Sequence, residues 1–207
     1  MNWETQIKQI ANETWGKILK EKIRNFSWNN FTFNYRAEHT ELVLSIGIEI
    51  GNKLGADMEI LKAALLLHDI GRSIVEKEHA KVGAQIAEEI LLNTNFPQKK
   101  IDKVKYAITT HVGWDESVPE TLEACILWDA DKLSKLGASI ILHKAMILPL
   151  KGKNSFDAVS EFNDWLKTAE YIKVNMKTKL GLKMAEERYQ TLEMFVTALS
   201  KEVHKNH

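Results

Sequence analysis

Residues 65–72 read LLLHDIGR, and this run sets the architecture around it. The stretch 61–67 is apolar on nearly every side of a helix, so we predict a buried helix there. His68 and Asp69 then place two strongly polar side chains at the inner end of that helix. Burial of such groups is costly unless partners satisfy them, so other polar side chains are expected beside them.

Helical periodicity extends over the rest of the chain. Only three prolines and ten glycines interrupt 207 residues, and apolar residues recur mainly at three- and four-residue spacing. We predict an all-α fold in a single domain, 1–207, since no repeat, linker or biased segment divides the chain. Helices are expected at about 3–24, 36–54, 57–67, 78–92, 97–111, 120–136, 138–148, 155–179 and 182–204, with Gly181 between the last two.

Composition narrows the class of protein. Hydrophobic residues make up 44% of the chain and charged residues 27%, as in ordinary globular proteins. The 28 basic residues balance 28 acidic ones, so no overall field attracts a nucleic-acid polymer or an anionic membrane. The single Cys125 excludes an intramolecular disulfide and a cysteine-based zinc cage. With neither a signal peptide nor a run of about 20 apolar residues, a soluble cytoplasmic protein is expected.

Further polar candidates adjoin apolar helical turns, as His68 and Asp69 do. They are His39, His79, His111 and Asp131. A lone helical histidine more often packs or lies on the surface than binds metal, and this packing role is assigned to His143. Several buried imidazoles and carboxylates together, however, are the ordinary way to hold a divalent cation.

These residues resemble the HD-domain superfamily of metal-dependent phosphohydrolases. The family pattern is a His on one helix, a His-Asp pair ending another, and a distant Asp. His39 in RAEH resembles the first, His68-Asp69 the pair, and Asp131 in DADKL the last ligand. The likeness covers about residues 36–204, and the tail is similar to a bacterial subgroup of uncharacterised HD hydrolases. It implies an HD-type helical bundle with a motif core at about 36–137 and C-terminal helices at about 155–204.

Two histidines bear on the number of metals that the resemblance implies. Further His ligands follow the pair in dinuclear HD proteins, such as symmetrical dinucleoside tetraphosphate hydrolases and cyclic-dinucleotide phosphodiesterases. His79 and His111 come in that order, whereas the mononuclear subgroup usually keeps a counterpart of His111 alone. One divalent site is therefore expected and a second is left open, with a surface position as the alternative for His79. The ligand set suits Mn, Mg, Fe, Co, Ni or Zn.

The resemblance also suggests roles around the metal. Asp69 is the catalytic carboxylate and the natural bridge between two metals. Arg72 and Lys132 are candidates for contact with phosphate, and Arg36 for substrate binding, because developing negative charge needs fixed positive charge. For each cation a surface ion pair is the alternative. Trp114 is proposed as a wall for a nucleobase.

The implied function is hydrolysis of a nucleotide or similar small phosphate ester through a metal-activated water. Two alternatives stay open at this point. Some HD-fold proteins with a similar ligand set are di-iron oxygenases, and a nucleotide-binding regulatory module could keep the site but turn over slowly. The expected partner is a small phosphate substrate, and long amphipathic helices are compatible with a homodimer.

Overall fold

In a computed structural model of the chain, residues 2–23, 34–112 and 118–203 are described, and all their regular structure is helical. The all-α prediction is therefore confirmed. The chain separates into two compact units, Met1–Ala130 and Asp131–His207. The prediction of a single domain stays a prediction.

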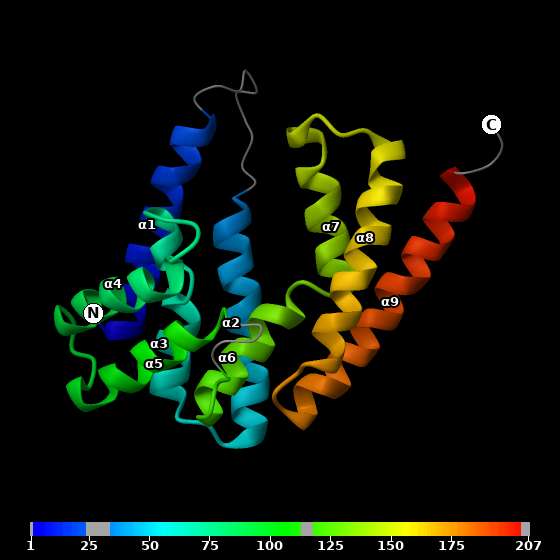
Figure 1. Cartoon of the computed structure of the whole chain (residues 1–207). Coiled ribbons are helices and arrows are strands. Elements are labelled where there is room, and N and C mark those ends of the chain that lie inside the picture. The colour runs from blue at the N-terminus through cyan, green and yellow to red at the C-terminus, as the bar shows by residue number, and fades with distance from the viewer. Residues whose placement is uncertain (1, 24–33, 113–117, 204–207) are drawn as a thin grey trace. The chain divides into compact units, whose positions relative to one another are not determined.

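The first unit is built around a short, buried helix. Its elements are α1 (Trp3–Ile23), α2 (Tyr35–Leu54), α3 (Met58–Leu67), the 3-10 turn η1 (Ile70–Ser73), α4 (His79–Leu92), η2 (Gln98–Lys100), α5 (Ile101–Thr110) and most of α6 (Leu122–Leu133). Helix α3 packs against α1, α2 and α5, while α4 packs against α5 and η1 (Figure 1). All residues of α3 from Ile60 onward except Lys62 are buried, as its apolar sequence predicts.

Local signals place α3 as the sequence predicts. Helix α2 ends at Gly55, whose φ of 72° is left-handed and suits glycine. Asp57 then begins α3, because its carboxylate accepts hydrogen bonds from the backbone N–H groups of Glu59 and Ile60. The tight turn and the cap fix the direction of α3, and therefore the place where its end delivers His68.

Beyond α3, the turn η1 lies directly on the start of α4. A Cβ atom on Gly71 would collide with the carbonyl oxygen of His79 and lie 2.6 Å from the backbone nitrogen of Gly83. Only glycine permits this approach. The turn that follows Asp69 is thus held against the helix that begins with His79.

The second unit is a helical layer of its own. It contains the end of α6, α7 (Gly137–Ile147), η3 (Pro149–Lys151), α8 (Ser155–Val174) and α9 (Lys179–Val203). Helix α9 packs against α7 and α8, and Figure 1 shows α8 and α9 running antiparallel. The predicted break at Gly181 is wrong, since Gly181 lies inside α9. The chain breaks earlier because the Thr178 hydroxyl accepts a hydrogen bond from the Gly181 N–H and caps α9.

Among the described residues, no single helix is long and apolar enough to cross a membrane. One bent pair, Leu122–Leu133 with Gly137–Lys151, meets the length and composition only when its two helices are added together.

The close approach of η1 to α4 gives a stability prediction. Gly71→Ala is expected to lower the free energy of unfolding by about 1–3 kcal/mol, because the atoms it would strike are backbone and cannot rotate away. Gly16→Ala in α1 is the matched control, since a Cβ there meets nothing within 4 Å. Urea unfolding followed by circular dichroism measures both variants. Equal stability of the two would contradict the packing described for Gly71.

Candidate metal centre

The first unit brings five of the predicted site residues together. They are His39, His68, Asp69, His79 and His111, and all are buried. They form two groups that share Asp69: one with His39 and His68, the other with His79 and His111. Within each group, one ligand atom per residue lies within 4.8 Å of the others. Burial of His79 excludes the surface position that was its alternative.

Asp69 presents a different carboxylate oxygen to each pair of histidines. Its Oδ2 lies 3.9 Å from Nε2 of both His39 and His68, and those two nitrogens are 3.2 Å apart. Its Oδ1 lies 3.4 Å from Nε2 of His79 and 3.6 Å from Nε2 of His111. One carboxylate therefore has a separate pair of imidazole nitrogens beside each oxygen.

The backbone sets the orientation of three of these rings. His68, His79 and His111 each bond through Nδ1 to the carbonyl oxygen of the residue three positions earlier. A carbonyl oxygen can only accept, so Nδ1 carries a proton, and in the neutral ring Nε2 keeps its lone pair. In that form the three Nε2 lone pairs lie on the side of the ring that faces Asp69. Metal-binding histidines in proteins are held in this way.

Two further observations fit a cation at this place. The Nε2 atom of His79 is buried and has no hydrogen-bond partner within the described ranges, a costly state for a polar atom. Burial also lowers the pKa of His79, which favours the neutral, ligating form. Burial would raise the pKa of Asp69, but its interactions with His68, His111 and His39 outweigh burial and hold that pKa well below its usual value. An ionised carboxylate among imidazole lone pairs suits a divalent metal.

Two arginines complete the surroundings of Asp69. Arg36 Nη1 lies 3.0 Å from Oδ2, and Arg72 Nε lies 2.7 Å from Oδ1. Both guanidinium groups also reach Glu76: Arg72 Nη1 is 2.7 Å from its Oε2, and Arg36 Nη2 is 3.6 Å from its Oε1. Arg36 and Arg72 are therefore ion-paired at the edge of the histidine cluster. Their contact with phosphate stays a prediction.

The remaining predicted residues belong to the second unit or fall outside the described residues. Asp131 belongs to the second unit, where it is buried and its Oδ2 lies 2.8 Å from Nζ of both Lys132 and Lys135. Lys132 is itself buried, which excludes the surface ion pair that was the alternative role for this residue. The roles of Asp131 as a ligand and of Lys132 as a phosphate contact stay predictions. Trp114 lies outside the described residues.

Two residues near the cluster were not predicted from the sequence. The ring of Tyr35 stacks on the ring of His39, with centroids 5.8 Å apart and planes at 16°. Cζ of Arg36 lies 5.6 Å from the centroid of the Tyr35 ring. Glu76 follows Arg72 by four residues, a spacing that suits an ion pair on a helical turn. That spacing is common on protein surfaces, so it does not single out Glu76.

Comparison with known proteins agrees with this arrangement. Residues 36–136 match the model of the HD domain family. Ribonuclease Y of Alkaliphilus metalliredigens is 34% identical over 110 residues, which is 48% of this chain but only 21% of that protein. The chain thus spans about a fifth of the length of that relative. YpgQ of Bacillus subtilis is 25% identical over 204 residues, 96% of this chain and 94% of YpgQ.

Solved structures show the same fold along the chain. A predicted HD superfamily hydrolase from an uncultured Thermotogales bacterium matches with a TM-score of 0.65 and 24% identity, over 96% of this chain and 91% of that one. Bacillus subtilis YpgQ in complex with ADP matches with a TM-score of 0.68 and 21% identity, over 98% and 97% of the two chains. The matched segment 36–136 contains every residue of the histidine cluster. Through that segment, which is just under half of the chain, the protein matches the HD domain family.

Proposed function

We propose that this protein is a metal-dependent phosphohydrolase that acts on a nucleotide or a similar small phosphate ester. The observation that carries the proposal is the ionised Asp69 carboxylate between two pairs of histidines. An HD domain implies a divalent metal, and the donor set here suits Mn, Mg, Fe, Co, Ni or Zn. The nucleotide part of the proposal is supported by the structural likeness to YpgQ, which has been solved with ADP.

The chain would hold the metal through residues already in place. His39, His68 and Asp69 would hold one cation, and Asp69, His79 and His111 a second, with Asp69 as the shared ligand. A cation bound there would supply Lewis acidity, which lowers the pKa of a water molecule and neutralises a phosphoryl oxygen. The backbone carbonyls that hold the rings keep the ligand atoms oriented before substrate arrives.

Two positive side chains would act on the substrate. Arg36 and Arg72 lie on opposite oxygens of Asp69, so their guanidinium groups are fixed near the cluster. Guanidinium donors suit phosphate oxygens because they offer planar, paired N–H groups. They would bind the phosphate and stabilise the negative charge that develops on it.

A small substrate is favoured over a nucleic-acid polymer. A polymer-binding surface needs a run of unpaired basic side chains. Two lysines at α5 that could form one are already paired: Lys100 contacts Asp57 and Glu59 at 2.6 and 2.7 Å, and Lys105 contacts Glu88 at 2.7 Å. The match to ribonuclease Y covers only 21% of that protein, and a small phosphate ester is proposed as the substrate.

One observation also favours a second candidate function. Two ligand groups around a shared carboxylate suit a pair of iron ions, the cofactor of HD-fold oxygenases. Iron-dependent oxygen consumption would support that reading. Hydrolysis of a phosphate ester that proceeds without iron would count against it.

The metal site is tested first by removal of the shared carboxylate. Asp69→Asn keeps the size of the side chain but removes its charge, so metal affinity is expected to fall more than about 100-fold. Elemental analysis and metal titration of the purified protein give the readout. Asp102→Asn is the control, because Asp102 is 95% exposed and its ion pair with Lys105 is long, at 3.7 Å. Retention of metal by the Asp69 variant would refute the site.

The number of metals is tested at His79. Wild-type protein saturated with Mn is expected to bind two ions per chain, and His79→Gln is expected to bind one, because His79 belongs to only one of the two ligand groups. His143→Gln changes another buried histidine, on α7, and should leave the count at two. A wild-type count of one that His79→Gln leaves unchanged would show a mononuclear site.

Activity is tested with nucleoside di- and triphosphates and Mn. Wild-type protein should release phosphate or pyrophosphate from at least one of them, and Asp69→Asn should reduce kcat at least about 10³-fold because the metal-activated water is lost. Chelation of the metal should have the same effect on the wild type. Unchanged turnover in the variant would exclude this mechanism.

A further inference from the structure

Four charged residues form a closed ring at the edge of the histidine cluster. Arg36 and Arg72 lie between two carboxylates, Asp69 on the inner side and Glu76 on the outer side. Each carboxylate gives one oxygen to each arginine. The inner side chain, Asp69, is 5% exposed, whereas the outer one, Glu76, is 66% exposed. The two positive and two negative charges cancel, so the ring has no net charge while Glu76 is in place.

The two sides of this ring differ in how readily they open. Ion pairs at exposed positions are weak, because water screens them and the side chains lose entropy when they are held. The contact of Arg36 with Glu76 is also long, at 3.6 Å. Asp69, in contrast, is buried and its contacts with both arginines are 3.0 Å or shorter. Asp69 therefore holds the guanidinium groups in position, and Glu76 can leave them.

The backbone at Glu76 is held separately from its side chain. Its carbonyl oxygen accepts the hydrogen bond from Nδ1 of His79, at 2.7 Å. The carboxylate can thus swing away from the arginines while the carbonyl keeps the imidazole oriented. A change of the side chain alone leaves that backbone contact available.

We propose that the Glu76 carboxylate occupies the seat of the substrate phosphate, bridging Arg36 and Arg72, and that an incoming phosphate group displaces it. Glu76 places one carboxylate oxygen beside each guanidinium group, and a phosphate group could place two of its oxygens in the same way. Once Glu76 has left, the ring carries one net positive charge, which favours an anion. This inference rests on the proposed phosphohydrolase function and deepens it, since it assigns the place where the phosphate binds.

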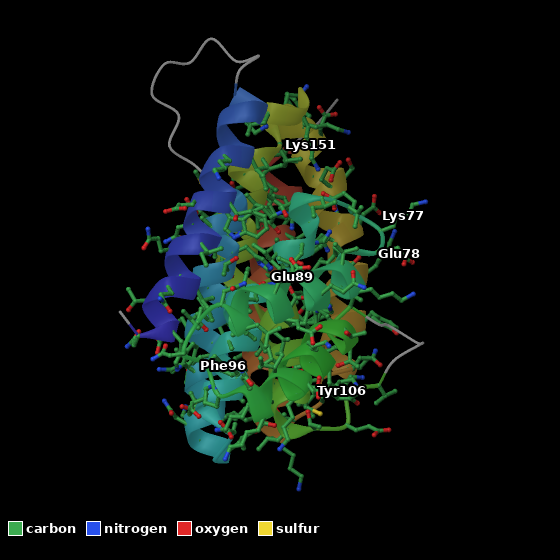
Figure 2. The ribbon with its side chains drawn as sticks, turned by 90° about the vertical axis from the view of Figure 1, so that its left-hand side faces the viewer. Lys77, Glu78, Glu89, Phe96, Tyr106 and Lys151 are labelled. Carbon is green, nitrogen blue, oxygen red and sulfur yellow. The ribbon has the colours of Figure 1, made fainter. Side chains whose placement is uncertain are left out.

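The test is the affinity for inorganic phosphate, measured by isothermal titration calorimetry on the protein as purified. Glu76→Gln removes the competing charge but keeps the shape, so phosphate is expected to bind about fivefold or more tightly than to wild type. Glu78→Gln is the matched control. Glu78 lies two residues away, projects from the edge of the ribbon in Figure 2, and pairs with Lys81 at 3.5 Å. It should change the affinity less than about twofold.

The opposite outcome has a clear meaning. If Glu76 instead orients the arginines for substrate, Glu76→Gln will weaken phosphate binding, and the proposal is overturned. It is also overturned if the affinity is unchanged, or if Glu78→Gln tightens binding as much. In the Glu76→Gln background, Arg72→Lys should abolish the gain, because an ammonium group cannot give the paired contact of a guanidinium.

Failure of the proposed function would look different from failure of this inference. Phosphate affinity is measured without turnover, so a gain in Glu76→Gln would stand even if no nucleotide were hydrolysed. If nucleotides are hydrolysed, Glu76→Gln should lower KM and strengthen inhibition by phosphate by a similar factor. Hydrolysis with no change in either quantity would leave the function intact and refute the displaced carboxylate.

Discussion

A carboxylate that is ionised and only 5% exposed needs positive charge or hydrogen-bond donors on every side, and Asp69 has both. Two arginines contact its oxygens directly, and four histidine nitrogens lie within 3.9 Å of them. Removal of either arginine would weaken this compensation in a poorly solvated place. Elements of the first unit bring the six partners to one point: α2 carries Arg36 and His39, His68 follows α3, Arg72 lies in η1, His79 begins α4 and His111 follows α5.

Apolar packing around the cluster offsets the free-energy cost of burying its polar side chains. Helix α3 is almost entirely buried, and its burial offsets the cost of carrying His68 and Asp69 inward at its end. Gly71 then lets the backbone press against α4, where His79 begins the helix. The polar centre thus depends on a backbone contact that no side chain could replace. Residues 65–72 therefore combine three buried leucines, the polar pair His68-Asp69 and the closely packed Gly71 within one short segment.

Much of this arrangement could be predicted from the sequence, because it depends on local signals. The caps at Gly55 and Asp57, the apolar run of α3 and the His-Asp pair all act within a few residues. The place of His79 could not be predicted from chain order alone, since spacing along the chain gives no distance between helices; the structure shows that it is buried beside Asp69. Glu76 was missed because its partner Arg36 lies 40 positions away. The α8–α9 break was misplaced because the Thr178 cap outweighed the glycine signal at Gly181.

Both oxygens of Asp69 are proposed to face metal positions. Anomalous diffraction from crystals grown with Mn, recorded above the Mn absorption edge, measures this directly. Two anomalous peaks are expected, one beside each Asp69 oxygen, each at about 2.0–2.3 Å from the Nε2 atoms of its own histidine pair. Mn at saturating concentration with no peak beside Asp69, or with peaks only at other side chains, would show that Asp69 does not hold metal.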